Sequence, residues 1–391
     1  MTQSDLPHFS RRISRLTSSL IRELLALTQQ PGIISFAGGL PAEALMPPLS
    51  LEGVPPALRQ YGTTDGEPGL REALSARLNA QGLACPAENV LITSGSQQGI
   101  DMVAKVFIDE GTPVLLEKPA YLAALQVYGL YGAAMQGVAV HPDGIDMDSL
   151  RAVCAAQRPV FLYINPSFQN PTGYSYSDAR RRELAAFLDE QNIVLIEDNP
   201  YGELSYDAPQ PAPVSAYLKS APWVYLGSFS KIAVPAWRVG YLAADPRLAP
   251  VFRKIKQGTD LHTNRPGQWW CEQFLRDEAG LAAHLDRLRD YYRGQRDAME
   301  AALNEHMADV AEWSAPQGGL FFWVRVHAVE DTRALLDEAL ARQVAYLPGE
   351  AFYPPGSGVC NAIRLSFSGV SRESLNEGVA RLGALFREHR R

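Results

Sequence analysis

The stretch GSFSKIAVPAWRVG, residues 227–240, places Lys231 directly after Ser230 and seven residues before Arg238, in an otherwise small or apolar segment. It follows an apolar run at 223–226 and leads into another at 239–243, which predicts a turn between two buried strands. A lysine on a solvated surface needs no such surroundings. A lysine that bonds covalently to a phosphorylated cofactor needs them, because hydroxyl and guanidinium groups bind phosphate.

The composition limits what kind of protein this is. The chain has 391 residues, of which 46% are hydrophobic and 20% charged, so we expect a large core and two domains. The net charge of −7 argues against a nucleic-acid partner, which would need a basic face or tail. No run reaches the ~18 apolar residues of a membrane span, and the N-terminus has no apolar h-region. We expect a small-molecule partner, no nucleic acid and no membrane.

The four cysteines, at positions 85, 154, 271 and 360, form no C-x-x-C pair, and none has a histidine at metal-ligand spacing. This pattern predicts neither a disulfide framework nor a metal site. It fits reduced thiols in a cytoplasmic protein.

Short apolar runs alternate with helical patterns through the middle of the chain. The runs read as buried strands, and the pattern at 97–109 reads as an amphipathic helix; the six runs lie at 90–93, 113–116, 160–164, 193–196, 223–226 and 239–243. Such alternation is typical of a mostly parallel α/β sheet covered on both faces. After about residue 290 the sequence pattern changes to one typical of a smaller α+β domain.

Ligands of an open parallel sheet bind at the carboxyl ends of its strands, so we consider the residues that follow each run. SGSQQG at 94–99 predicts a glycine-serine turn opening a helix, which can bind an anion, although an ordinary tight turn is the alternative. Asn170 lies in QNPTG, where a simple turn is again the alternative. Asp198 in EDNPY ends a buried strand; it could pair with a protonated ring nitrogen, or serve as a helix cap or salt bridge. Tyr201 could reach the same ring.

Together these sites converge on a ligand with a ring nitrogen, a phosphate and an aldehyde, which is pyridoxal 5′-phosphate (PLP). The chain resembles the fold-type I aminotransferases of classes I and II. The resemblance rests on seven motifs in the family's order: ISFAGGLP, YGTTDG, TSGSQQG, QNPTG, EDNPYGEL, GSFSK with RVG, and IRLSFS. It is strongest to the branch of 2-aminoadipate aminotransferases, which also contains multi-substrate enzymes.

The resemblance implies an α/β fold with a mostly parallel seven-stranded sheet in a large PLP-binding domain, residues 48–288. It further implies a smaller α+β domain at 289–391 and an N-terminal arm at 1–47 that joins the small domain and the entrance of the active site. The implied activity is transfer of an amino group from an L-amino acid to a 2-oxo acid, 2-oxoglutarate being the expected acceptor. Possible donors are 2-aminoadipate, glutamate, and branched or aromatic amino acids.

The resemblance assigns roles to the residues found above. Lys231 would bond to the cofactor and move the proton, Asp198 would keep the ring nitrogen protonated, and Tyr201 and Asn170 would bind the ring's phenolic oxygen. Tyr121 would stack on the ring. The phosphate would be held by Gly95, Ser96, Gln97, Ser228, Ser230 and Arg238.

The remaining implied residues concern the substrate and the subunit contact. Arg364 would bind the substrate α-carboxylate, although an arginine at a strand edge facing water is the alternative. Asn170 and Gly39 would lie beside the substrate, and Arg22 would receive the distal carboxylate of an acidic substrate, unless it merely sits on a solvated helix face. Tyr61 would reach the phosphate of the neighbouring subunit, which makes a homodimer with shared sites.

Two alternatives remain for the function. This branch also occurs fused to DNA-binding domains as a non-catalytic PLP-sensing module, but the ~30 residues before ISFAGG leave no room for a winged helix. A different PLP reaction, such as β-elimination or decarboxylation, is the second alternative. A Rossmann dehydrogenase is disfavoured because the glycine turn lacks G-x-G-x-x-G.

Overall fold

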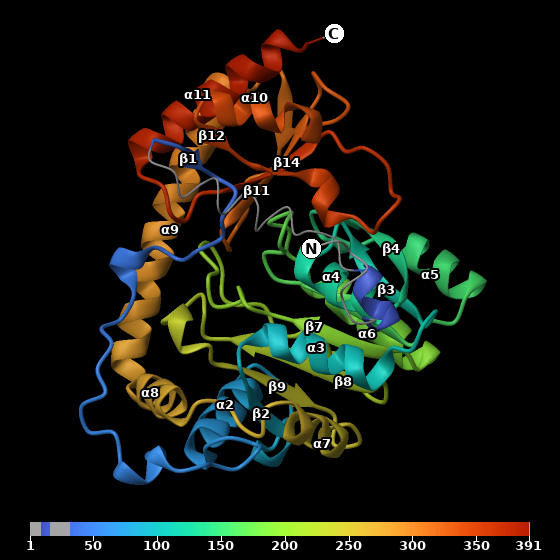
Figure 1. The fold of residues 1–391 in the computed structure, drawn as a ribbon, viewed down its shortest axis with the longest axis vertical. Helices are drawn as coiled ribbons and strands as arrows, with labels where there is room; N and C mark the ends of the chain where they lie inside the picture. The colour runs from blue at the N-terminus through green and yellow to red at the C-terminus, as the bar shows by residue number, and fades with distance from the viewer. Residues whose placement is uncertain (1–8, 16–31, 391) are drawn as a thin grey trace.

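An eight-stranded sheet forms the centre of the protein, which we describe from a computed structural model covering residues 9–15 and 32–390 (Figure 1). Its strand order is β2-β9-β8-β7-β6-β3-β4-β5. The strands are β2 (Val90–Thr93), β3 (Pro113–Lys118), β4 (Ala134–His141), β5 (Gly144–Ile145), β6 (Phe161–Ile164), β7 (Val194–Asp198), β8 (Trp223–Ser228) and β9 (Gly240–Ala244).

The sheet is mostly parallel, as the sequence predicts. Strands β4, β3, β6, β7 and β8 run parallel to one another, whereas β9 is antiparallel to both β8 and β2. The eighth strand, β5, has two residues and extends the expected seven strands by a short antiparallel pairing with β4. The parallel strands therefore bring their carboxyl ends to one edge, where the following loops meet.

Helices cover both faces of this sheet. One face packs against α3 (Ser96–Phe107), α4 (Leu122–Tyr131) and α7 (Ala249–Thr259). The other packs against α2 (Pro68–Ala80), α5 (Met147–Ala156) and α6 (Asp178–Gln191). With both faces buried, the central strands are largely apolar, and the FLYI run of β6 is fully buried.

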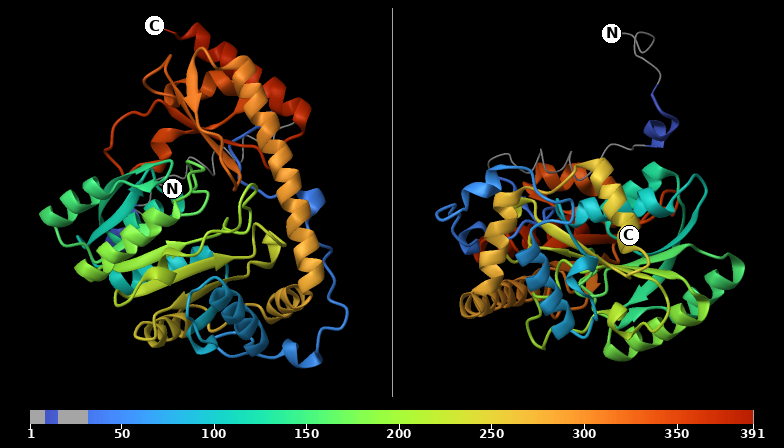
Figure 2. Two further views of the ribbon diagram at one scale, coloured as in Figure 1. Left: turned by 180° about the vertical axis from the view of Figure 1, so that it is seen from behind. Right: turned by 90° about the horizontal axis from the view of Figure 1, so that it is seen from below.

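A second sheet of four antiparallel strands lies beyond the carboxyl edge of the first, in the order β10-β11-β14-β13. The 29-residue helix α9 (Glu278–His306) follows α8 (Arg265–Arg276) and runs alongside both sheets, as Figures 1 and 2 show. The other elements of this part are β10 (Ala311–Trp313), β11 (Phe321–Val326), α10 (Leu336–Ala341), β12 (Val344–Ala345), β13 (Leu347–Pro348), β14 (Ala362–Ser366) and α11 (Arg372–Glu388).

The segment near residue 34 forms a separate two-stranded sheet with β12 and is hydrogen-bonded to β14 of the second sheet. Strand β1 (Ile34–Ser35) pairs in parallel with β12, and the Phe36 carbonyl accepts a hydrogen bond from the Ser366 backbone N–H. This pairing carries residues 37–39 to the space between the two sheets. The expected domain boundary at 288/289 falls within the unbroken helix α9 and stays a prediction.

All six predicted apolar strands are confirmed, as is the helix at 97–109, which is α3. Strand β4 was not predicted. Of its eight residues only Val138 is buried, because β4 is flanked by β3 on one side and by only the two residues of β5 on the other. A weakly buried strand gives no continuous apolar run. Among the helices of residues 9–15 and 32–390, none has the length and apolarity needed to cross a membrane.

Candidate active site

Five of the predicted site segments meet at the carboxyl edge of the large sheet. Asp198 is the last residue of β7, and its parallel pairing with Leu226 places it near the end of β8, which leads into the turn that carries Lys231. Gly95 follows β2, Tyr121 follows β3, and Asn170 lies in the turn after β6. The strand order, rather than closeness in sequence, collects these side chains.

Lys231 faces the N-terminal segment. Its Nζ donates a hydrogen bond to the Gly39 carbonyl at 2.9 Å. Loss of hydration lowers the pKa of Lys231 to about 8, and the positive charges of Arg364 and Arg238 act in the same direction. An amine with this pKa is available in its neutral form near neutral pH, so it can act as a nucleophile or a base.

Asp198 is buried, and one of its two carboxylate oxygens accepts a hydrogen bond from another side chain. Its Oδ2 accepts a 2.7 Å hydrogen bond from the Tyr163 hydroxyl, while its buried Oδ1 has no partner within residues 9–15 and 32–390. Burial raises the pKa of Asp198 to about 7, and the Tyr163 hydrogen bond acts in the opposite direction. A buried carboxylate oxygen without a donor is costly, so this atom marks a place for an N–H donor from a ligand.

The adjacent carboxylate, Glu197, serves the fold. It points to the other face of the sheet, where it accepts hydrogen bonds from the Val214 and Ser215 backbone N–H groups and from the Ser215 hydroxyl, at 2.7–3.0 Å. Alternation along β7 thus separates the two carboxylates. Of these two carboxylates, Asp198 is the one with an oxygen that has no hydrogen-bond partner among the described residues.

A group of donors suited to a phosphate surrounds the N-terminus of α3. Gly95 precedes this helix with φ +80°, and a Cβ on it would lie 2.6 Å from Nη2 of Arg238, so only glycine fits there. Arg238 Nη1 lies 3.4 Å from the Ser230 hydroxyl, and the Ser230 N–H donates to the Ser228 hydroxyl at 3.1 Å. The helix dipole adds positive potential at the same point.

The two neighbouring glutamines of this turn, Gln97 and Gln98, have different surroundings. Gln97 is exposed on the first turn of α3, whereas Gln98 accepts from the Ser94 N–H at 2.8 Å and donates to Asp260 at 2.7 Å. Gln98 therefore fixes the loop to the α7–α8 connection. Ser96, half-buried at the start of α3, lies beside Gly95.

Arg364 is buried on β14, between β11 and β13, so it does not face water at a strand edge. Its Nη1 donates to Asn170 Oδ1 at 2.8 Å, and its Nη2 donates to the carbonyls of Ala37 at 2.5 Å and Gly38 at 3.0 Å. Its Nε is buried and has no acceptor in the described part of the chain. Arg364 thus retains donor capacity for an anionic ligand.

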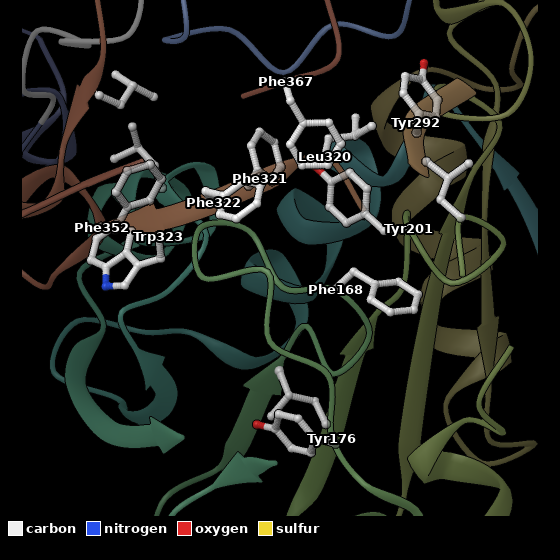
Figure 3. Packing of buried hydrophobic residues seen from close by; sticks show 14 of the residues in the cluster. Phe168, Tyr176, Tyr201, Tyr292, Leu320, Phe321, Phe322, Trp323, Phe352 and Phe367 are labelled. Atoms are coloured by element: carbon white, nitrogen blue, oxygen red, sulfur yellow. The ribbon is translucent and has the colours of Figure 1, made fainter. Parts of the chain in front are cut away.

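Aromatic rings surround this arginine. Its guanidinium carbon lies 4.3 Å from the Phe321 ring centroid and 5.2 Å from that of Phe352. Tyr201 meets Phe321 edge-to-face at 5.8 Å between ring centroids, and Figure 3 shows both rings in the buried cluster. A Cβ on Gly39 would come within 2.9 Å of the Phe321 ring, so the N-terminal segment passes close by.

Two tyrosines complete the cluster. Tyr201 is buried, which raises the pKa of its hydroxyl, whereas hydrogen bonding with Asn170 acts in the opposite direction. Burial raises the pKa of Tyr121 to about 12, and the Tyr121 hydroxyl also senses the charges of Asp198, Arg364 and Arg238. Both hydroxyls stay protonated at neutral pH and can donate hydrogen bonds.

Two predicted residues stand apart. Tyr61 is 76% exposed and meets His262 edge-to-face, and within residues 9–15 and 32–390 no hydrogen bond joins its side chain to the Lys231 cluster. Its predicted action on a second subunit stays a prediction. Arg22 lies outside the described residues.

The sequence reasoning missed two residues that support Asp198. Asn165 donates to the Asp198 carbonyl at 2.5 Å and accepts from the Asn170 N–H at 2.8 Å. It follows an apolar run, so the same inspection of strand ends could have found it. Tyr163 lies inside the run FLYI and gave no signal of its own.

Three observations show that these residues fit PLP: an Asp198 oxygen without a partner in the described part of the chain, a lysine with a lowered pKa, and a glycine turn beside Arg238. The described part of the chain has no group of three or more His, Cys, Asp or Glu side chains that could hold a metal ion.

Comparison with known proteins agrees with this fit. The profile of the family described as "Aminotransferase class I and II" matches residues 39–382. The chain is 39% identical over 386 residues to the 2-aminoadipate transaminase of Thermus thermophilus, covering 96% of this chain and 95% of that protein. It is 35% identical over 396 residues to aromatic-amino-acid aminotransferase 1 of Thermococcus litoralis, covering 97% of this chain and 94% of that protein.

A solved structure of a similar aminotransferase has the same fold. The α-aminoadipate aminotransferase of Thermus thermophilus, complexed with N-(5′-phosphopyridoxyl)-L-leucine, superposes with a TM-score of 0.88 at 36% identity, covering 97% of both chains. The chain belongs to the class I and II aminotransferases and has the fold-type I architecture. It is a PLP-dependent aminotransferase that acts on amino acids and 2-oxo acids.

Proposed function

We propose that this aminotransferase accepts both acidic and neutral L-amino acids and uses 2-oxoglutarate as its amino acceptor. The observation that carries the proposal is Arg364, a buried guanidinium beside Lys231 whose Nε has no partner among the described residues, which suits the α-carboxylate common to all these substrates. The breadth is supported by relatives named for 2-aminoadipate and for aromatic amino acids, and by the leucine adduct in the Thermus structure.

The proposed cofactor site uses the side chains described above. Asp198 would meet the ring nitrogen, Tyr201 and Asn170 the phenolic oxygen, and Tyr121 the ring face. The phosphate would lie at the α3 N-terminus, held by Gly95, Ser96, Gln97, Ser228, Ser230 and Arg238. When bound, PLP supplies the aldehyde that takes up the amino group and the ring that withdraws electrons.

The chain's own residues then hold and move the reacting groups. Arg364 would bind the α-carboxylate through two parallel hydrogen bonds and thereby fix the substrate Cα close to Lys231. Lys231 Nζ would move the proton between the substrate Cα and C4′ of the cofactor, since an amine with a pKa of about 8 is partly neutral near neutral pH. Asn170 and Gly39, which contact Arg364 and Lys231 respectively, would border the bound substrate.

We further propose a homodimer in which Tyr61 of each chain contributes to the partner's phosphate site. The exposure of its large side chain, at 76%, is consistent with a role across an interface. A cytoplasmic location is supported by the four free cysteines, which fit a reducing compartment.

A panel of amino acids tested with 2-oxoglutarate examines the proposed specificity. The donors 2-aminoadipate, leucine and phenylalanine should each yield the corresponding 2-oxo acid, and the Lys231→Ala variant should yield none; glutamate, whose product is 2-oxoglutarate itself, gives no net change in this assay. Formation of glutamate from 2-oxoglutarate measures transfer from the other donors directly. Release of ammonia or carbon dioxide in place of transfer would instead indicate elimination or decarboxylation.

A further inference from the structure

Asp198 receives a hydrogen bond from inside the sheet. Tyr163 lies on β6, the neighbour of β7, and its backbone is level with Ile196, two residues before Asp198. Tyr163 and Ile196 belong to the core face formed with α3 and α4, and alternation along β7 places the Asp198 side chain on that same face. The Tyr163 hydroxyl therefore reaches along the face to Asp198 Oδ2 at 2.7 Å.

The donor is held rigidly. Tyr163 is fully buried, and its ring meets Tyr128 of α4 edge-to-face at 5.8 Å between centroids. The acceptor is fixed through its backbone as well, since Asn165 Nδ2 donates to the Asp198 carbonyl. Neither group can turn away without breaking core packing or a buried hydrogen bond.

The two oxygens of Asp198 consequently differ. Oδ2 is occupied by Tyr163, and Oδ1 is buried without a partner in residues 9–15 and 32–390. A hydroxyl that donates to a carboxylate favours the ionised form of that carboxylate. Tyr163 thus affects both the direction in which Asp198 offers its free oxygen and the ease with which Asp198 takes up a proton.

We propose that Tyr163 is a positioning residue that turns Asp198 Oδ1 toward the cofactor's ring nitrogen and keeps Asp198 ionised, so that the shared proton stays on the ring nitrogen. This inference rests on the proposed role of Asp198. It assigns Tyr163 no contact with the substrate, so its effect should fall on the chemical step and not on substrate binding.

The test uses the Tyr163→Phe holoenzyme loaded with PLP labelled with ¹⁵N in the ring. Without the hydroxyl, Asp198 becomes a stronger base, and the ¹⁵N resonance should move from the pyridinium position toward that of neutral pyridine. We expect kcat to fall about ten- to hundredfold, as for loss of one hydrogen bond to a charged group, with KM for the amino acid changed less than about twofold.

Tyr128→Phe is the matched control. Tyr128 is an equally buried tyrosine that touches Tyr163, and its hydroxyl has no hydrogen-bond partner among the described residues. Both variants remove one buried hydroxyl from the same core. Tyr128→Phe should leave the ¹⁵N position and kcat near those of the parent, so a common change in both variants would report packing and overturn the proposal.

Asp198→Asn separates this inference from the function on which it rests. If Asp198 contacts the ring nitrogen, this variant must shift the ¹⁵N resonance by at least as much as Tyr163→Phe does. A resonance unmoved in Asp198→Asn would refute the role of Asp198. A resonance moved in Asp198→Asn but not in Tyr163→Phe would refute the role of Tyr163 alone.

Should Tyr163→Phe not fold, replacement of Tyr163 by 3-fluorotyrosine keeps the ring and the hydrogen bond while making the hydroxyl a stronger donor. The ¹⁵N resonance should then stay at, or move further toward, the pyridinium position. Movement toward neutral pyridine would contradict the inference.

Discussion

Replacement of Arg364 by lysine tests the substrate site most directly. The guanidinium donates to Asn170 Oδ1, to the Ala37 and Gly38 carbonyls, and offers Nε as a further donor. A lysine has a single nitrogen and cannot keep these partners and also bind a carboxylate in parallel fashion. Arg364→Lys therefore keeps the positive charge and removes the planar set of N–H donors.

The expected magnitude follows from the bonds that are lost. A hydrogen bond to a charged group contributes about 1.5–3 kcal/mol, so losing one of two bonds to the substrate carboxylate should lower kcat/KM about ten- to hundredfold. The reduction should be similar for leucine and 2-aminoadipate, because both carry the same α-carboxylate. Acceptors left unpaired near Ala37 and Asn170 should also lower the free energy of unfolding by about 1–3 kcal/mol.

The assay measures kcat/KM for both amino acids with 2-oxoglutarate, together with urea unfolding of each protein. Arg325→Lys on the adjacent strand β11 is the control, since Arg325 is exposed and pairs with Glu312 at 3.1 Å. Arg325→Lys should change both kcat/KM and the free energy of unfolding little. An unchanged kcat/KM in a folded Arg364→Lys protein, or a loss confined to 2-aminoadipate, would show that Arg364 does not bind the α-carboxylate.

Three further predictions concern the other groups of the site. Burial and the charges of Arg364 and Arg238 lower the pKa of Lys231 to about 8, so the neutral fraction of the amine rises through pH 8. The rate at which PLP loads onto the apoprotein, followed by the visible absorbance of the imine, should therefore level off above that pH. Lys231→Ala should show no imine absorbance. A rate that keeps rising toward pH 10.5, the ordinary lysine value, would contradict this. Mixed dimers of Tyr61→Phe and Lys231→Ala chains should be more active than either parent, because each dimer holds one intact site; equal activity argues against a site built in trans. Arg22→Ala should raise KM for 2-oxoglutarate and 2-aminoadipate far more than for leucine, and an equal effect on all of them would argue against binding of the distal carboxylate by Arg22.

Most of the large sheet could be predicted from the sequence because its central strands are buried on both faces. Burial of this kind produces continuous apolar runs, and β6 with its four buried residues is an example. Strand β4 lacks this signal because Val138 is the one buried residue among its eight, and the others are half-buried or exposed. A strand whose side chains are mostly half-buried or exposed gives no clear apolar pattern, so hydrophobic periodicity cannot distinguish it from a loop.

The candidate site was predictable where a polar residue lies at the end of an apolar run or in the loop that follows it. Asp198, Lys231 and Asn170 all satisfy that rule, and the structure brings them to one edge of the sheet. Contacts between distant segments were not predictable from spacing. The hydrogen bond of Arg364 to the Ala37 carbonyl spans 327 residues, and the bond of Tyr163 to Asp198 needs the side-by-side pairing of β6 and β7.

The charges of the site would allow Lys231 to act at two different stages of the proposed reaction. Arg364 and Arg238 approach it from different sheets, one on β14 and the other in the turn before β9, and both lower its pKa. A phosphate at Arg238 and a carboxylate at Arg364 would each neutralise one of these positive charges. By Coulomb's law the pKa of Lys231 then rises, so the amine is easily deprotonated before these anions bind and becomes a stronger base afterwards. In the proposed mechanism Lys231 would then be most basic when it meets the proton of the substrate Cα, and this ordering would follow from placing two arginines from different sheets around a single amine.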